Sequence, residues 1–356
     1  MLFILRQKPT VMIKSILFTL IGSAIINFSV AQAPKPIAKT AEGFYNDGIK
    51  LKDQKKYPAA ILSFKNAIAK NPNYKEAFYA AGWCSNELNK YSDALGYLQK
   101  AKTLWPDEAK VYLELGYANQ QSGKDNEAKD CYNKCLSLKD DYSLAYQYLG
   151  NLFFSEKDYK KALQEYDSYS KYEPNITSAT VYYKMGYCQD DAEKYNDAVS
   201  SLNKAISLKA GYVDAYNELG YANKKLEKAD DAIKNYNDAL RFDPKSTTAI
   251  NGIGDVYKDV KKDMDEALKT FFRSLAIDPK NKKTNYLIGW CYNDKGKYND
   301  AVPYLKKLSK QIRIIRMPLQ SWAIAIMHSK IMMMLYACST GLSLLIRQIL
   351  LFIMPV

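Results

Sequence analysis

A glycine that recurs at nearly constant spacing is the strongest constraint on what this chain can fold into. It returns every 34 to 36 residues, at Gly48, Gly82, Gly116, Gly150, Gly186, Gly220, Gly254 and Gly289. A step of this length is typical of repeats built from two short helices, and one such repeat cannot bury its apolar face alone. The chain of 356 residues is therefore predicted to form one array of stacked repeats.

Other positions recur with the glycine. An alanine follows most of the glycines by twelve residues, as Ala128 follows Gly116, and small residues at both places allow two helices to approach closely. An aromatic residue often precedes this alanine by three, as Tyr91 does, and a proline such as Pro72 closes many of the units. Because proline cannot continue a helix interior, it marks the boundary between repeats.

These residues resemble the tetratricopeptide repeat. The matching positions are Gly48, Ala60, Phe64, Ala67 and Pro72 in a first repeat and Tyr216, Leu219, Gly220, Ala232, Tyr236, Ala239 and Pro244 in a sixth. The resemblance covers about residues 41–310 and implies an all-α fold, a right-handed superhelical solenoid of antiparallel helix pairs, with eight repeats in residues 41–309. Extra residues near Asn175 and Val260 are expected to alter the solenoid locally.

The N-terminal segment has the pattern of a secretory signal. From Met12, a candidate initiator, Lys14 supplies the positive region, residues 16–30 are mostly apolar, and small residues allow cleavage after Ala31. We predict a signal peptide in residues 1–31, a linker in 32–40, and export to the periplasm or cell envelope. An uncleaved membrane anchor is the alternative, although the apolar run is short for a span.

The repeat pattern stops after Leu308, and residues 310–356 are rich in apolar residues and contain no acids. Methionine and tryptophan each have a single codon, so a shifted reading of Met332-Met333-Met334 forces Asp-Asp, and a shifted reading across Trp322 allows a glycine near position 323, one repeat after Gly289. We interpret residues 310–356 as an out-of-frame translation of a ninth repeat. Resequencing the gene across the Ser309 codon tests this interpretation, and an uninterrupted frame as written contradicts it.

Composition argues against catalysis and nucleic-acid binding. The net charge is +13, but much of the excess lies in the two ends, and lysines mix with acids along the repeats as on solvated helix faces. We find no phosphate-binding loop, no metal-ligand cluster and no activated nucleophile, and His328 lies in the tail. Asp190-Asp191 and Asp230-Asp231 are interpreted as turn and helix-start residues. The chain is predicted to be no enzyme and to bind no cofactor, metal or nucleic acid.

A binding surface follows from the resemblance. In the resembled family the first helix of each repeat lines a concave groove that holds an extended peptide or a partner helix. On this basis the predicted groove residues are Tyr45, Tyr79, Trp83, Asn86, Tyr117, Gln120, Asn151, Tyr183, Tyr187, Tyr221, Tyr286 and Trp290. Tyrosine and tryptophan dominate binding hot spots. The alternative is that these rings only pack against the adjacent repeat.

The sequence therefore predicts a non-enzymatic scaffold that binds a protein or peptide partner. Membrane contact is expected only through an uncleaved N-terminal segment. Two other functions remain open: a carbohydrate- or peptidoglycan-binding module, because sugars also stack on aromatic rings, and the regulatory repeat region of a truncated larger protein. The lysine and asparagine set with which some members of the resembled family clamp a C-terminal carboxylate does not occur at the corresponding positions.

Overall fold

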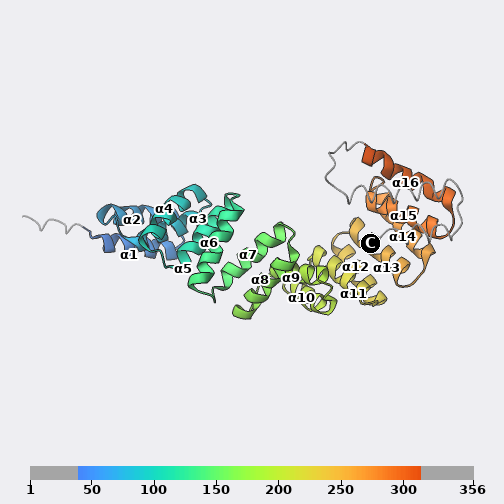
Figure 1. The fold of residues 1–356 in the computed structure, drawn as a ribbon, viewed down its shortest axis with the longest axis horizontal. Helices are drawn as coiled ribbons and strands as arrows, with labels where there is room; N and C mark the ends of the chain where they lie inside the picture. The colour runs from blue at the N-terminus through green and yellow to red at the C-terminus, as the bar shows by residue number, and fades with distance from the viewer. Residues whose placement is uncertain (1–38, 314–356) are drawn as a thin grey trace, which may run out of the picture. The chain divides into compact units, whose positions relative to one another are not determined.

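The computed structural model describes residues 39–313, and this part of the chain is entirely helical between its turns (Figure 1). The helices are α1 (Ala41–Asp53), α2 (Tyr57–Lys70), α3 (Lys75–Glu87), α4 (Tyr91–Leu104), α5 (Ala109–Gln121), α6 (Asp125–Leu138), α7 (Ser143–Ser155), α8 (Tyr159–Tyr172), α9 (Ala179–Asp191), α10 (Tyr195–Leu208), α11 (Val213–Lys225), α12 (Ala229–Phe242), α13 (Thr247–Asp259), α14 (Met264–Ile277), α15 (Lys282–Asp294) and α16 (Tyr298–Arg313). Odd-numbered helices are called A helices below, and even-numbered ones B helices. The predicted signal peptide and nearly all of the predicted out-of-frame tail lie outside the described residues.

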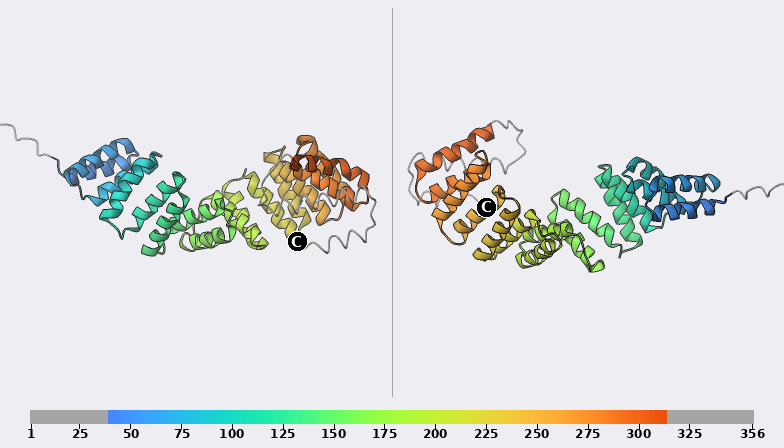
Figure 2. Two further views of the ribbon diagram at one scale, coloured as in Figure 1. Left: turned by 45° about the horizontal axis from the view of Figure 1, so that its top comes forward. Right: turned by 180° about the vertical axis from the view of Figure 1, so that it is seen from behind.

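The helices divide into two compact units that meet at Tyr74 and Lys75. In the first unit α1 packs against α2; in the second, α3 to α16 form seven further pairs (Figure 2). Within the second unit each B helix also packs against the next A helix, and α3 and α5, α5 and α7, α9 and α11, and α11 and α13 are in contact. The predicted all-α solenoid of consecutive helix pairs is confirmed. No helix among residues 39–313 has the length and apolar character needed to cross a bilayer.

Neighbouring repeats share their core. Ala94, Leu98 and Ala101 of α4 form one buried cluster with Val111 and Leu115 of α5, the A helix of the following repeat. Similar clusters join α6 with α7, α10 with α11 and α12 with α13. The apolar face of one pair is thus completed by the next pair, which is the arrangement expected of a repeat array.

The repeat glycine lies where the two helices of a pair come closest. A Cβ atom added at Gly150 would stand 2.8 Å from Cε1 of Tyr166, whose side chain is fully buried on α8. The alanine twelve residues after most of these glycines, or thirteen after Gly254, is also fully buried, as at Ala128 and Ala162. The expected role of these small residues, close approach of the A and B helices, is confirmed.

Each A helix is followed, two or three residues after its last residue, by a residue with left-handed backbone conformation. These residues are Lys55, Asn89, Gly123, Lys157, Glu193, Glu227, Lys262 and Gly296. At the third of them the chain reverses through a bond from the Lys124 N–H to the Asn119 carbonyl at 2.9 Å, as in the Schellman motif. The six of these residues that are not glycine adopt the left-handed conformation although it costs roughly 1–2 kcal/mol for a residue with a Cβ atom.

Two connections are longer than the others of their kind, one between two pairs and one within a pair, at the places where the sequence has extra residues. The turn between α8 and α9 runs from Glu173 to Ser178, and the turn between α13 and α14 contains Val260 to Asp263. In both places the flanking helices keep the pairing seen elsewhere, so the extra residues are absorbed in the turns.

Replacing Gly150 by alanine is expected to lower the free energy of unfolding by about 1–3 kcal/mol, because the new methyl group would overlap the Tyr166 ring in a packed interior. Gly96 provides the control, because it is an exposed residue of α4 and a Cβ atom added there would meet nothing within 4 Å. Gly96→Ala should instead raise stability by about 0.5–1 kcal/mol through helix propensity. Urea denaturation followed by circular dichroism measures both changes, and equal effects of the two substitutions would contradict the close-approach argument.

Candidate functional site

The predicted groove residues occupy one face of the A helices. Relative to the repeat glycine they lie three residues before it, one after it or four after it, so each helix presents them as a single stripe. Eleven of the twelve are half-buried, and only Asn86 is buried. Tyr45 lies in the first unit, where its ring contacts those of Phe64 and Tyr74. The other eleven belong to the second unit and are called the A-helix stripe below.

The aromatic members of the stripe pack on neighbouring rings. Tyr117 lies between Tyr91 and Tyr148, with ring centroids 6.2 and 5.7 Å away. The ring of Tyr187 lies 5.4 Å from Phe154 and 5.0 Å from Tyr159, both in the preceding repeat. Packing against the adjacent repeat, the alternative stated above, is therefore real for these rings, but each keeps part of its surface exposed.

Lysine ammonium groups lie over several of the remaining rings. The Nζ atom of Lys110 is 5.0 Å from the centroid of Tyr79, and that of Lys258 is 4.7 Å from the centroid of Trp290. Lys224 and Lys225 both approach Tyr221. Such contacts stabilise a partly exposed ring by roughly 0.5–1 kcal/mol.

The polar members are already engaged inside the protein. Gln120 accepts a hydrogen bond from the Tyr132 hydroxyl at 2.8 Å, and Asn86 donates to Oε2 of Glu114 in the next repeat at 2.8 Å. Asn151 accepts from the ammonium group of Lys184 at 2.6 Å. These residues therefore fix the A helices in place, and whether they also contact a partner stays a prediction.

Sequence reasoning missed the buried carboxyl groups of this face. Burial raises the pKa of Glu114 and of Glu218 to about 7, and burial together with the charge of Glu218 raises the pKa of Asp190 to about 8. The interpretation of Asp190-Asp191 as turn or helix-start residues was wrong, because α9 continues through Asp191 and places Asp190, 6% exposed, in its last turn. A negative charge is unfavourable there. Asp230 and Asp231 do lie in the first turn of α12.

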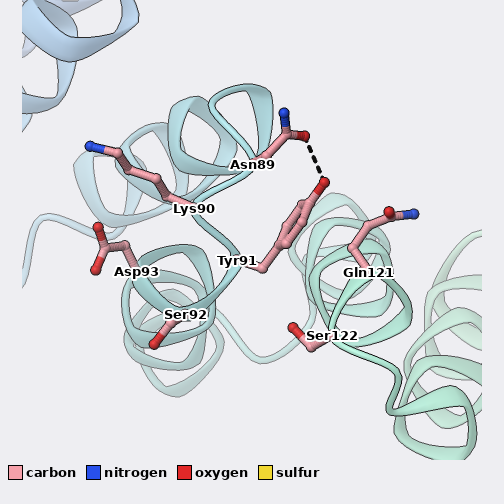
Figure 3. A pocket seen from close by; sticks show the side chains of 7 residues that line it. All are labelled: Asn89, Lys90, Tyr91, Ser92, Asp93, Gln121 and Ser122. Atoms are coloured by element: carbon pink, nitrogen blue, oxygen red, sulfur yellow. Dashed lines mark hydrogen bonds between the residues drawn. The ribbon is translucent and has the colours of Figure 1, made fainter.

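A pocket of about 570 Å³ borders the stripe. It is formed by the turn before α4, the start of that helix and the end of α5, through residues 89–93, Gln121 and Ser122. Figure 3 shows the Tyr91 ring standing between Asn89 and Gln121, with its hydroxyl donating to Asn89 at 2.6 Å. The pocket contains no member of the stripe, but Tyr91 connects it to Tyr117.

The cysteines of the described residues are poorly suited to chemistry. Burial raises the pKa of Cys135, Cys188 and Cys291 to about 12, so their thiols stay protonated and weakly nucleophilic at neutral pH. Within residues 39–313 no three His, Cys, Asp or Glu side chains are grouped so that they could hold a metal ion.

Two family models described as tetratricopeptide repeat match the sequence, one over residues 46–109 and the other over 109–142, 179–212, 213–246 and 283–310. Together they cover more than half of the chain. The chain belongs to the tetratricopeptide repeat (TPR) family. The models leave out residues 143–178 and 247–282, which contain the two longer turns, although α7–α8 and α13–α14 form the same TPR hairpins.

Solved structures of other TPR proteins are similar in fold. A TPR protein from Parabacteroides merdae has a TM-score of 0.50 and 16% sequence identity, and the match covers 72% of this chain and 98% of that one. The C-terminal part of a TPR repeat-containing protein from Cytophaga hutchinsonii gives 0.49 and 21%, covering 67% and 97%. YrrB, a TPR protein with an unusual peptide-binding site, gives 0.49 and 20%, covering 52% and 95%. No curated protein matches the sequence significantly.

The buried carboxyl groups predict an unusual dependence of stability on pH. Because the pKa of Asp190 is about 8 in the folded chain and its ordinary value is 3.8, the folded state binds more protons than the unfolded state between these values. Stability should therefore fall as pH rises from about 4 through 8. Asp190→Asn should raise the melting temperature at pH 8.5 by several degrees and leave it nearly unchanged at pH 5. Thermal denaturation at both pH values measures this, and an equal effect at the two would contradict burial of a neutral carboxyl group.

Proposed function

We propose that this TPR protein is an exported, non-enzymatic scaffold whose A-helix stripe binds an extended segment of a partner protein. Membership in the TPR family supports the general role of a protein-interaction scaffold. One observation carries the proposal that the A-helix stripe is the binding surface. The rings of the stripe are held in place by packing, yet each keeps exposed surface. Rigid, partly exposed aromatic rings bind with little loss of conformational entropy.

Contacts within the chain support this role because they order the side chains of the stripe before a partner binds. Tyr117 and Tyr187 are supported by rings of the preceding repeat, and Trp290 by Lys258, so a partner meets side chains that are already ordered. The polar stripe residues that hold the A helices together define the spacing of these rings. A preorganised surface of this kind is what a peptide needs in order to bind tightly over a modest area.

The proposal predicts that a variant carrying Trp83→Ala, Tyr117→Ala and Tyr187→Ala loses a partner retained by the wild type. The full chain would be immobilised and exposed to cell-envelope extract, with circular dichroism confirming that the variant is folded. A control carrying Leu208→Ala and Phe242→Ala removes apolar side chains that are 46% and 50% exposed on B helices. We expect the control to bind like the wild type and the triple variant to bind at least about tenfold more weakly, the effect of about 1.4 kcal/mol.

Retention of the partner by the triple variant would move the binding site away from the stripe. If soluble glycans release the bound material and competing proteins do not, the carbohydrate-binding alternative would be favoured instead.

The exported location is a separate part of the proposal and rests on the N-terminal pattern in residues 1–31. Cell fractionation should place the mature chain in the envelope, and its N-terminal sequence should begin at Gln32 if cleavage follows Ala31. A cytoplasmic chain that retains its first residues would contradict export. Lys14→Glu should slow export, since it removes the positive charge that precedes the apolar run.

A further inference from the structure

Buried acceptors without a donor are concentrated on α9 and α11. Six buried side-chain oxygen atoms of the described residues have no hydrogen-bond partner, and four of them are Oε1 of Gln189, both carboxyl oxygens of Asp190, and Oδ1 of Asn217. An amide can be reversed to exchange its oxygen for a donor, but a carboxylate has no donor to offer. Asp190, 6% exposed, is therefore the informative member, because an unpaired buried carboxylate is costly.

An equivalent place in another repeat shows what is unusual about Asp190. Asn86 lies four residues after Gly82, and its amide donates to Glu114, which lies 28 residues further on and two before Gly116. Asp190 and Glu218 have the same positions relative to Gly186 and Gly220. Where one pair of repeats places an amide beside a carboxyl group, the other places two carboxyl groups.

The B helix explains why no internal donor compensates. In the third repeat the Tyr132 hydroxyl donates to Gln120, which has the same position relative to its glycine as Asp190. In the fifth repeat Leu202 takes the place of Tyr132, and its side chain lies against Gly186. Asp190 therefore has the acceptor position of Gln120 without the hydroxyl that satisfies it.

The surroundings of this acid pair are partly exposed. Glu218 is half-buried, Asp214 one turn before it is exposed, and the rings of Tyr183 and Tyr187 are half-buried. The rings lie close to the acids: after burial, the charges of Glu218 and Asp214 are the largest causes that raise the pKa of Tyr183. The pKa of Tyr187 is raised mainly by its hydrogen bond with Tyr159 and by burial, and the charge of Glu218 raises it further.

The lysines of this region have other partners. Lys224 pairs with Asp259 at 3.2 Å, Lys258 contacts both Asp255 and Asp259, and Lys184 donates to Asn151. Lys283 reduces the pKa rise of Glu218 but lies 3.9 Å from Asp255. Among the described residues no lysine or arginine forms an ion pair with Asp190 or Glu218, in a chain whose net charge is +13.

We propose that Tyr183, Tyr187, Asp214 and Glu218 form a subsite that takes one cationic side chain, preferably arginine, of the partner segment, with Asp190 supporting Glu218 from behind. This inference rests on the proposed function and names the chemistry that one part of the stripe recognises. A guanidinium group pairs with a carboxylate through two parallel hydrogen bonds and stacks on tyrosine, so it suits this combination better than an ammonium group.

Occupation of the subsite is coupled to a proton. Without a partner, a proton held by the acid pair reduces the repulsion between Asp190 and Glu218; an arriving cation takes over this role, and the proton leaves to solvent. Asp214 and Lys283 also act on the pKa of Glu218, and the charge of Asp190 raises the pKa of Tyr221 and of Tyr236. The charged groups of the neighbouring helix α8 and of the start of α10 act on one another instead: Lys194 lowers the pKa of Asp167, and Asp197 raises it. Affinity for a cation should therefore rise from pH 6 to pH 8.5.

The test compares two blocked, fluorescein-labelled peptides, (Gly-Arg)₃ and its neutral isostere (Gly-citrulline)₃, in binding to the full chain by fluorescence anisotropy. We expect the arginine peptide to bind about tenfold or more tightly at pH 8, which is the size of a charge-assisted contact. The net positive charge of the chain cannot produce this preference. Glu218→Gln should abolish it, and Asp190→Asn should weaken it and flatten its pH dependence.

Controls separate the subsite from folding and from the general proposal. Asp190→Asn is expected to fold, because Asn86 beside Glu114 is the same arrangement elsewhere in the chain. Asp197→Asn removes one exposed acid from α10 of the same repeat and should leave the preference unchanged. Equal binding of the two peptides, no binding of either, or a preference that survives Glu218→Gln would overturn the subsite. If the triple aromatic variant still loses its partner in that case, the subsite is wrong while the proposed function stands.

Discussion

The contact between each repeat glycine and the side chain that the B helix places over it governs the rest of the structure. The covering residues are Phe64, Leu98, Tyr132, Tyr166, Leu202, Tyr236, Phe271 and Leu305, and all are at most 4% exposed. This contact sets the distance between the helices of a pair, and with it the apolar face that the next pair must cover. Its strength lies in packing, so it tolerates an aromatic or a branched side chain but not a Cβ atom on the glycine.

The same contact also decides the polar chemistry of the opposite helix. Where the covering residue is Tyr132 or Tyr166, its hydroxyl reaches Gln120 or Asn151 and satisfies an acceptor on the A helix. Where it is Leu98 or Leu202, that donor is missing, and Asn86 keeps one unpaired oxygen and Asp190 two. A substitution that is neutral for the core is therefore not neutral for the polar groups of the A-helix face.

Sequence reasoning reached the fold because the fold is periodic. The glycine and alanine positions, the prolines and the two longer turns could all be located from spacing, since each repeat solves the same packing problem. The ring contacts of Tyr117 and Tyr187 could not, because they depend on how far one repeat is displaced from the next. Asp190 was misplaced because a run of two acids usually marks a turn or a helix start. Only the structure shows that α9 continues through Asp191.

Periodicity has a further consequence for anything bound along the A helices. A surface that repeats at each TPR offers an elongated ligand several positions of similar energy, each one repeat apart, and a ligand with evenly spaced anchors can slip between them. Only features that break the periodicity fix its register. In this chain the aromatic rings recur, whereas the Lys184–Asn151 bond, the Asn86–Glu114 bond and the Asp190–Glu218 pair are not shared by every repeat. Alignment of a ligand therefore depends on the non-repeated polar groups, while the repeated rings determine how strongly it is held.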